Sequence, residues 1–423
     1  MTRMKGGLVV AVGMLLARPT GAAQQPAAPM PITLSQAVTE AMDHNLSLLA
    51  ERYNVTLAAA AVVTAGLRPN PVITVNAMVP NRDLVDAGVA VDEGVVRTDY
   101  VLERGGKRER RVDQARLAQS VAELQLLDTT RKLVLDVETA FADVQLAKLN
   151  LALARDNLAA LTTVVSVNTE RVRTGDLAQV ELSRSRLAAL QFENDVEQQS
   201  TKLDVARNRL GLLIGRGSAG SGTLDVIGDM RRDSNVVDRT TLLTRALDMR
   251  PDLRAAKSEQ ARSVADLRLQ LANGKIDYTI SGEYHRMSGG GLVGNDYGVF
   301  FSTPLPIFNR NQGEIARAQV QQQQNDAKTK ALEAGIQADL DEAFAEYTSS
   351  RRVVERIESQ MLNQARDVRA TMEYSYRRGE ASLVEFLDAV RTFNDTTRSY
   401  NEARADYARS LYALDSIAGG VTP

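Results

Sequence analysis

The sequence predicts a mainly α-helical protein with a β-barrel portion, built by duplication of one unit. Three observations support this prediction: an internal repeat, two helical stretches too long for a globular core, and four stretches that alternate like strands. The 423-residue chain contains no Trp, and only 4% of its residues are aromatic. It is therefore poor in the bulky side chains that fill a thick core, and its Ala-, Leu- and charge-rich composition suits thin helical packing.

The composition excludes several classes of function. Lys and Arg number 51 against 53 Asp and Glu, so the chain lacks the basic excess of a nucleic-acid-binding protein. The absence of Cys excludes disulfides, thiolate metal clusters and Cys nucleophiles. The two His, His44 and His285, are far apart in the sequence, which argues against a His-rich metal centre. We therefore expect no catalytic residue, no metal site and no cofactor.

Residues 1–23 have the features of a secretory signal peptide. Arg3 and Lys5 precede an apolar stretch at 6–17, which is too short to span a bilayer, and small residues follow at 20–23. Residues 24–31 are expected to form a Pro- and Ala-rich linker. Because no Cys follows the signal, there is no site for a lipid anchor. No later segment approaches 18 apolar residues, so we expect export without a transmembrane helix.

The chain contains two copies of one unit, predicted at 32–215 and 240–419. A Gly- and Ser-rich linker, 216–239, joins them. The numerical offset between matching residues stays at 203–205 throughout, which chance does not produce. The matching pairs include Phe141 with Phe344, Arg173 with Arg377, Gly175 with Gly379, and Gly215 with Gly419.

Each unit has the same expected order of elements: short helices, two strands, a long helix, a Gly turn and a last helix. In the first unit, the helices cover about 34–44, 46–67, 107–173 and 177–214, and Pro69 and Pro71 end the second of them. In the second unit, they cover about 252–273, 313–378 and 381–418.

The long helices carry apolar residues at a seven-residue spacing, which predicts coiled-coil packing. At about 1.5 Å per residue, the stretch 107–173 would be about 100 Å long, which argues against an ordinary amphipathic core helix. The spaced residues are Val137, Val144, Leu151, Leu158 and Val165 in the first unit, and Leu340, Tyr347, Val354, Met361 and Val368 in the second.

Four stretches alternate with period two: 71–80, 95–104, 276–285 and 296–304. Their length is what a tilted strand needs to cross a bilayer. We expect polar loops at 81–94 and 286–295. The alternative is a small antiparallel sheet with one solvated face. Four strands cannot close a barrel, so a barrel requires several chains, and these considerations do not separate three copies from four.

The order of elements and four motifs resemble the TolC-like outer-membrane efflux factors. The resemblance covers about 32–419, and the last two motifs look most like the heavy-metal branch, the cobalt–zinc–cadmium and copper–silver efflux outer-membrane subunits. The motifs are LSQA at 34–37 with Asn45 and Leu46, RPNP at 68–71, PLPIFNRNQG at 304–313, and RRGEASLVEFLDA at 377–389.

This resemblance implies a homotrimer with a twelve-stranded barrel in the outer membrane of a Gram-negative bacterium, in contact with its lipid. An α-helical tunnel would extend into the periplasm, where a periplasmic adaptor protein would bind its tip. An inner-membrane RND-type pump would drive heavy-metal cations through this passive duct. Two alternatives keep the fold: the duct of a multidrug pump, and that of a type I protein-secretion system. A third, a structural periplasmic coiled-coil protein, needs no barrel.

The candidate functional residues surround the two Gly turns. Gly175 and Gly379 are expected at the periplasmic tips, because a break in a coiled coil requires a local turn. The charged residues beside them are candidate adaptor contacts, although exposed charges often serve only solvation. These residues are Arg171, Arg173, Asp176, Arg377, Arg378 and Glu380.

Three acidic residues are candidates for the periplasmic aperture. Glu385 and Asp388 are spaced i, i+3 on one helical face, and the resemblance matches them with the acidic constriction of the family. Three copies would place six such carboxylates around the opening, where a charged ring selects ions by sign. Glu181 is the counterpart in the first unit, and salt links from it to Arg173 or Arg377 would close the opening. Without a His or Cys partner, these carboxylates do not indicate an enzyme.

Overall fold

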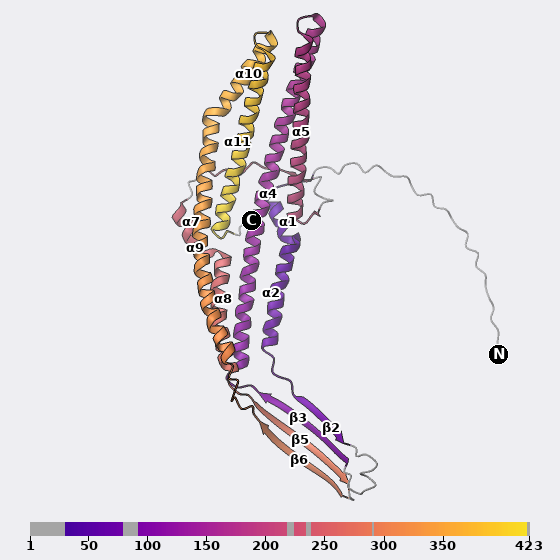
Figure 1. The fold of residues 1–423 in the computed structure, drawn as a ribbon, viewed down its shortest axis with the longest axis vertical. Helices are drawn as coiled ribbons and strands as arrows, with labels where there is room; N and C mark the ends of the chain where they lie inside the picture. The colour runs from indigo at the N-terminus through magenta and orange to yellow at the C-terminus, as the bar shows by residue number, and fades with distance from the viewer. Residues whose placement is uncertain (1–29, 79–91, 218–223, 234–237, 290–291, 421–423) are drawn as a thin grey trace, which may run out of the picture.

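The computed structural model describes residues 30–78, 92–217, 224–233, 238–289 and 292–420. The predicted signal peptide, most of the linker 24–31 and much of the loop 81–94 lie outside the described residues. The molecule is a long rod with helical tips at one end and a sheet at the other (Figure 1). This separation places the turns at Gly175 and Gly379 far from the strands.

The first repeat follows the predicted order closely. Its α1 and α2 are joined at Asn45, whose side-chain Oδ1 accepts hydrogen bonds from the backbone N–H of Ser47 and Leu48, at 3.0 Å each. Asn45 thus caps the second helix while it ends the first. The elements are α1 (Leu34–His44), α2 (Leu46–Ala65), β2 (Val72–Met78), β3 (Asp92–Leu102), α4 (Lys107–Thr174) and α5 (Gln179–Leu213).

The second repeat has the same order, with one additional break. The predicted helix 313–378 is divided by a π-turn, η1, and a helix α7 that the sequence analysis did not specify occupies the place of α1. The elements are α7 (Arg239–Met249), α8 (Pro251–Asn273), β5 (Tyr278–Gly289), β6 (Leu292–Ser302), α9 (Gln312–Arg356), η1 (Ile357–Met361), α10 (Leu362–Arg378) and α11 (Leu383–Ile417).

The π-turn accommodates one residue that the first repeat lacks. The offset between repeats is 203 at Phe141 and Phe344 but 204 at Gly175 and Gly379. A π-turn holds one more residue than an α-turn, and α4 is continuous over the matching stretch. The chain bends where α9 passes into α10 (Figure 1).

The insertion explains where the predicted seven-residue spacing fails in the second repeat. Leu340, Tyr347 and Val354 are buried as predicted. Met361 and Val368 are 45% and 48% exposed, so the prediction is wrong for them. One extra residue rotates everything after it by about 100° around the helix axis, which moves both side chains off the contact face.

The predicted spacing in the first repeat also changes along the helix. Val137, Val144 and Leu151 are buried, whereas Leu158 and Val165 are only half-buried. Nearer the tip, the buried positions are Ala154, Asn157, Leu161, Val164 and Asn168. The asparagines among them interrupt the hydrophobic pattern, so the true contact face was not visible as an apolar stripe.

The four predicted strands form one antiparallel sheet in the order β2-β3-β5-β6. Its register gives two chemically different faces. One face carries rows such as Val75, Val96, Tyr284 and Tyr297, which are paired across the sheet. The opposite face is more polar, with rows such as Thr74, Arg97 and Glu283, and Asn76, Val95, His285 and Asp296. One apolar and one polar face is the pattern of a strand that separates lipid from water.

The expected polar loop at 286–295 is largely wrong. Strand β5 continues to Gly289 and β6 begins at Leu292, with Arg286 paired to Asn295 and Met287 to Gly294. Polar and Gly residues hide the alternation here, although the backbone pairing continues. Similarly, β3 begins at Asp92, inside the expected loop 81–94.

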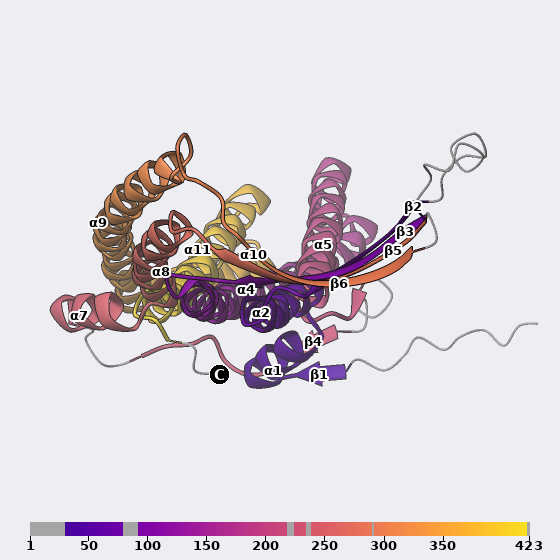
Figure 2. The same ribbon diagram turned by 90° about the horizontal axis from the view of Figure 1, so that it is seen from below.

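Two linkers contain short strands that the sequence analysis missed. Strand β1 (Met30–Ile32) pairs in parallel with β4 (Leu224–Val226), so parts of the expected linkers 24–31 and 216–239 are ordered. Strands of three residues are too short to show alternation, and Ile32, Leu224 and Val226 are nonetheless buried in the main core. Viewed along the rod, β1, β4, α1 and α7 lie on one side of the long helices, outside their arc (Figure 2).

One helix among the described residues, α2, is apolar and long enough to cross a membrane by length and composition. The expectation that no later segment reaches this level is therefore wrong. Glu51 and Arg52 interrupt the apolar run, so no unbroken stretch of 18 apolar residues exists. The mean hydropathy of the helix is nevertheless high, because the remaining residues outweigh these two charges. Only 6% of the apolar window is buried, and Leu46, Leu57 and Val63 are largely exposed, so α2 presents an uncovered apolar surface.

Candidate functional site at the helical tips

Both predicted Gly turns are present and have the same geometry. Gly175 and Gly379 adopt φ values of 87° and 80°, a left-handed conformation that costs residues with a side chain about 1–2 kcal/mol. The backbone N–H of Asp176 donates to the Arg171 carbonyl at 2.8 Å, and that of Glu380 donates to the Ser375 carbonyl at 2.9 Å. These bonds complete a Schellman motif, so each long helix ends sharply and the next can return alongside it.

The charged residues at the tips interact mainly within their own hairpin. Arg173 pairs with Glu170 at 2.7 Å, and Arg377 pairs with Glu373 at 2.5 Å. The guanidinium of Arg378 lies 4.5 Å from the ring centre of Tyr374. Asp176 accepts a hydrogen bond from the Thr174 hydroxyl at 2.7 Å, and Glu380 is exposed. These side chains leave a charged, solvent-facing tip.

Of the three aperture candidates, Glu385 has a structural role within its own helix. It forms a capping box with Ser382: the Glu385 carboxylate accepts from the Ser382 backbone N–H and hydroxyl, at 2.8 Å each. These hydrogen bonds lower the pKa of Glu385, so the group stays ionised. Asp388, one turn further along α11, is exposed and has no hydrogen-bond or ion-pair partner in the described part of the chain.

The salt links expected for Glu181 are not formed in the structure. Glu181 is half-buried and pairs with Arg184 on its own helix at 2.8 Å, rather than with Arg173 or Arg377. Both arginines have closer acidic partners three or four residues away on their own helices. Spacing in the sequence could not reveal this, because i, i+3 and i, i+4 pairs compete with any link between hairpins.

A buried contact that the sequence analysis missed joins the two hairpins. The Tyr376 hydroxyl donates to Asn168 Oδ1 at 2.8 Å; Tyr376 is 4% exposed and Asn168 fully buried. The Tyr376 ring stacks on Phe386, with centroids 5.4 Å apart. The sequence held one signal of this contact. At the repeat offset of 204, Tyr376 matches Val172, so the second repeat has a hydroxyl group at a position where the first repeat has none.

Below this contact, two pairs of asparagines join α4 to α11. Asn157 Nδ2 donates to Asn394 Oδ1 at 3.0 Å, and Asn401 Nδ2 donates to Asn150 Oδ1 at 3.0 Å. All four are buried, and the two residues on each helix are seven apart. Buried asparagines at core positions of a coiled coil fix its register, so these pairs set how the two repeats align.

A titratable carboxyl lies further from the tips, on α4. Burial raises the pKa of Glu138 to about 7, and the Arg231 charge opposes this shift in part. Tyr412 and Asp415 of α11 also face Glu138. Arg231 itself pairs with Asp233 at 2.8 Å and with Asp415 at 2.5 Å. The segment 224–233 is thereby attached to both long helices.

The described residues contain no group of three or more His, Asp or Glu side chains that could hold a metal ion. His44 ends α1, and His285 lies in β5, where its Nε2 is 2.7 Å from a carboxylate oxygen of Glu93. The two histidines are therefore in separate parts of the rod.

A four-stranded sheet with one apolar face, continued by long helical hairpins with charged tips, is the architecture expected of one subunit of a membrane channel. The chain belongs to the outer membrane efflux protein family, which matches residues 37–216 and 242–420. This family consists of outer-membrane efflux channels, and the fold class predicted from the sequence is confirmed.

Among individual proteins, the chain is similar to the cobalt-zinc-cadmium resistance protein CzcC of Cupriavidus metallidurans. The two are 22% identical over 394 residues, which is 92% of this chain and 90% of CzcC. The outer-membrane channel OprN has a TM-score of 0.75 at 19% identity, covering 92% of this chain and 91% of OprN. CusC has a TM-score of 0.72 at 17% identity, covering 95% of this chain and 99% of CusC.

Proposed function

We propose that this chain is the passive exit duct of a tripartite efflux system that exports heavy-metal cations. The similarity to a cobalt-zinc-cadmium resistance protein over nine-tenths of both chains carries the choice of cargo. In this proposal, residues 1–23 direct export, the repeats 32–215 and 240–419 build the duct, and three copies join their sheets into a barrel of twelve strands. A periplasmic adaptor binds the tips, and an inner-membrane RND-type pump supplies energy.

The geometry of the chain supports a conduit with weak cation binding. The three acidic side chains Glu181, Glu385 and Asp388 lie within the first turns after the two Gly turns. A ring of such carboxylates attracts cations, and a passage must also release what it carries. The exposed charges at 171–176 and 377–380 are the proposed adaptor contacts. Single-residue contacts of this kind contribute about 0–1 kcal/mol each, so recognition would use several together.

The aperture is tested by neutralising its carboxylates without disturbing the helix cap. Glu385→Gln keeps an N3 residue suited to a capping box, so the double variant with Asp388→Asn changes charge alone. We expect weaker block of the pore by divalent cations in planar-bilayer recordings. The matched control is Glu193→Gln with Glu197→Gln, two exposed carboxyls further along α5. Equal block in wild type and the aperture variant would reject the proposed ring.

The cargo is tested by growth of a deletion strain on zinc, cobalt, cadmium, nickel, copper and silver, beside a panel of organic drugs. Sensitivity confined to a set of cations, restored by the intact gene, supports heavy-metal export. Sensitivity to drugs alone would reassign the duct to a multidrug pump, and loss of a secreted protein would reassign it to type I secretion. A purified chain that stays out of lipid vesicles would favour the structural coiled-coil alternative.

A further inference from the structure

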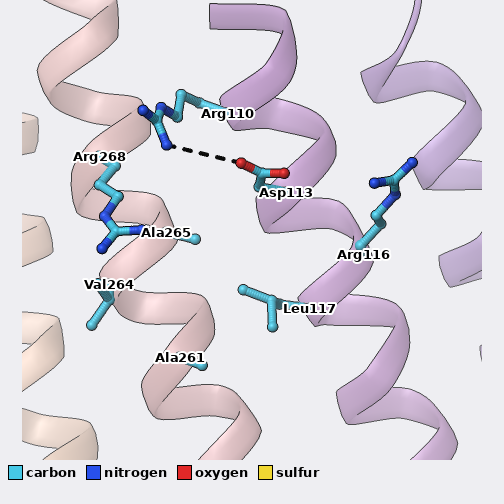
Figure 3. A pocket seen from close by; sticks show the side chains of 8 residues that line it. All are labelled: Arg110, Asp113, Arg116, Leu117, Ala261, Val264, Ala265 and Arg268. Carbon is cyan, nitrogen blue, oxygen red and sulfur yellow. Dashed lines mark ion pairs between the residues drawn. The ribbon is translucent and has the colours of Figure 1, made fainter. Parts of the chain in front are cut away.

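A groove between α4 and α8 has the composition of an anion site over an apolar floor. Its volume is about 520 Å³. The floor is formed by Leu117, Ala261, Val264 and Ala265, and the charged residues are Arg110, Arg116, Arg268 and Asp113. Figure 3 shows Arg110 and Arg268 reaching from the two helices toward the same gap, where Leu117 and Ala265 face each other.

The groove has an uncompensated positive charge. Two of its arginines, Arg110 and Arg268, reach into the gap beside a single carboxylate, Asp113, whose oxygen is 3.9 Å from Arg110, whereas Arg116 points away from the gap (Figure 3). Arg116 and Arg268 are exposed and have no hydrogen-bond or ion-pair partner within the described ranges. Guanidinium groups bind phosphate through paired N–H donors, so a phosphate is the complementary ligand.

The groove opens toward the outside of the arc of helices. Arg110 and Leu117 belong to a seven-residue series on α4 that continues through Glu138 and Gln145, and residues seven apart share a face of a coiled coil. Gln145 donates to the Gly228 carbonyl at 2.9 Å, so this face is the one covered by the segment 224–233. Figure 2 places the neighbouring strand β4 on the outer, convex side of the helices.

The groove also lies at the height of lipid headgroups. Helix α4 begins five residues after β3 ends, so Arg110 is about 5 Å along the helix and Arg116 about 14 Å. Arg268 is five residues before the end of α8, or about 8 Å. A headgroup layer is about 5–8 Å thick on each side of the hydrocarbon, and arginine side chains extend toward it. Nearby, the Arg104 guanidinium lies 4.4 Å from the ring centre of Tyr278, the first residue of β5.

We propose that the groove between α4 and α8 binds an anionic phospholipid of the periplasmic leaflet. Arg110 and Arg268 hold the phosphodiester, and the floor of Leu117 and small residues accepts the glycerol and the start of an acyl chain. The site would fix the depth and tilt of the duct in the membrane. It rests on the proposed membrane insertion of the sheet, because only that insertion brings headgroups to this height.

The test uses the full chain in detergent micelles that contain phosphatidylglycerol or phosphatidylcholine, with bound lipid counted by native mass spectrometry. We expect preferential retention of phosphatidylglycerol, weakened about fivefold for each arginine removed in Arg110→Gln with Arg268→Gln. Replacement of both by Lys should restore most of the retention, and Asp113→Asn should increase it. The control, Arg155→Gln with Arg186→Gln, removes two exposed arginines far from the sheet and should change nothing.

Equal retention of both lipids, or an undiminished signal in the Gln variant, would overturn the proposal. Equal loss in the control variant would do so too, because it would reflect net charge rather than the groove. Displacement by inorganic phosphate would assign the site to a soluble anion instead. Incorporation into nanodiscs is scored separately, since it reports insertion of the sheet. A chain that inserts without lipid preference refutes the groove and leaves the duct intact.

Discussion

Removing one oxygen atom from Tyr376 should loosen the contact between the two hairpins. Tyr376→Phe keeps the ring and its stacking on Phe386 but deletes the 2.8 Å hydrogen bond to Asn168. Asn168 is fully buried, and its Nδ2 already has no partner. The change therefore leaves a second buried polar atom unsatisfied, which costs about 1–3 kcal/mol.

This cost applies only while the hairpins are together, because water satisfies Asn168 once they separate. Since 1.4 kcal/mol is a factor of ten, a cost of about 1–3 kcal/mol should raise the ratio of separated to joined hairpins by about fivefold to about 140-fold. In planar bilayers, we expect a correspondingly larger open fraction. The matched control is Tyr374→Phe on the same helix, because Tyr374 is 55% exposed.

A double-mutant cycle with Asn168→Ala tests the pairwise origin of the effect. The two substitutions should be strongly non-additive, since either one removes the same hydrogen bond. If Tyr376→Phe opens the pore no more than Tyr374→Phe does, the buried contact does not hold the hairpins together. Additive effects would place the role of Tyr376 in its ring packing.

Three further predictions concern stability. Because the pKa of Glu138 is raised from 4.5 to about 7, the free energy of unfolding should fall as pH rises between these values. Glu138→Gln should flatten this pH dependence in urea titrations and should stabilise the protein at pH 8. An unchanged pH profile in the variant would contradict the burial argument. Gly215→Asn should lower the melting temperature far more than Gly175→Asn. A Cβ at Gly215 would lie 2.6 Å from a carbonyl oxygen of α1, whereas a Cβ at Gly175 would meet nothing within 4 Å. Equal shifts in melting temperature would refute this steric argument. Asn394→Ala should cost about 1–3 kcal/mol by leaving Asn157 unpaired, and restoration of most of that loss in the double Ala variant would confirm the pairing.

The sequence alone was sufficient to predict the repeat, the two Gly turns and the alternating strands. These features depend on local rules: a Gly at positive φ ends a helix, and a period of two marks a strand with two different faces. Gly175, Gly379 and the four alternating stretches could be predicted for that reason, whereas the pairing of Val75 with Val96 came from the structure. The family resemblance followed from the order of these elements.

Only the tertiary structure decided which side chains meet across the repeats. The pairing of Tyr376 with Asn168, and of Asn157 with Asn394, depends on the alignment of helices that are more than 200 residues apart in the sequence. The ion-pair partner of Glu181 likewise could not be predicted from the sequence, because a nearby arginine on the same helix competes with any distant arginine.

The π-turn is a further feature whose position could not be predicted from the sequence alone. The sequence determined that the second repeat has one more residue, since the offset rises from 203 to 204. It did not determine where that residue is accommodated, because a bulge, a loop or a longer turn would all satisfy the count. Packing against α11 and the segment 224–233 decided it: Glu358, in the π-turn, accepts hydrogen bonds from Arg232 at 2.9 Å and Tyr400 at 2.7 Å. Local propensity acts along the chain, whereas these contacts exist only once the repeats have folded against each other.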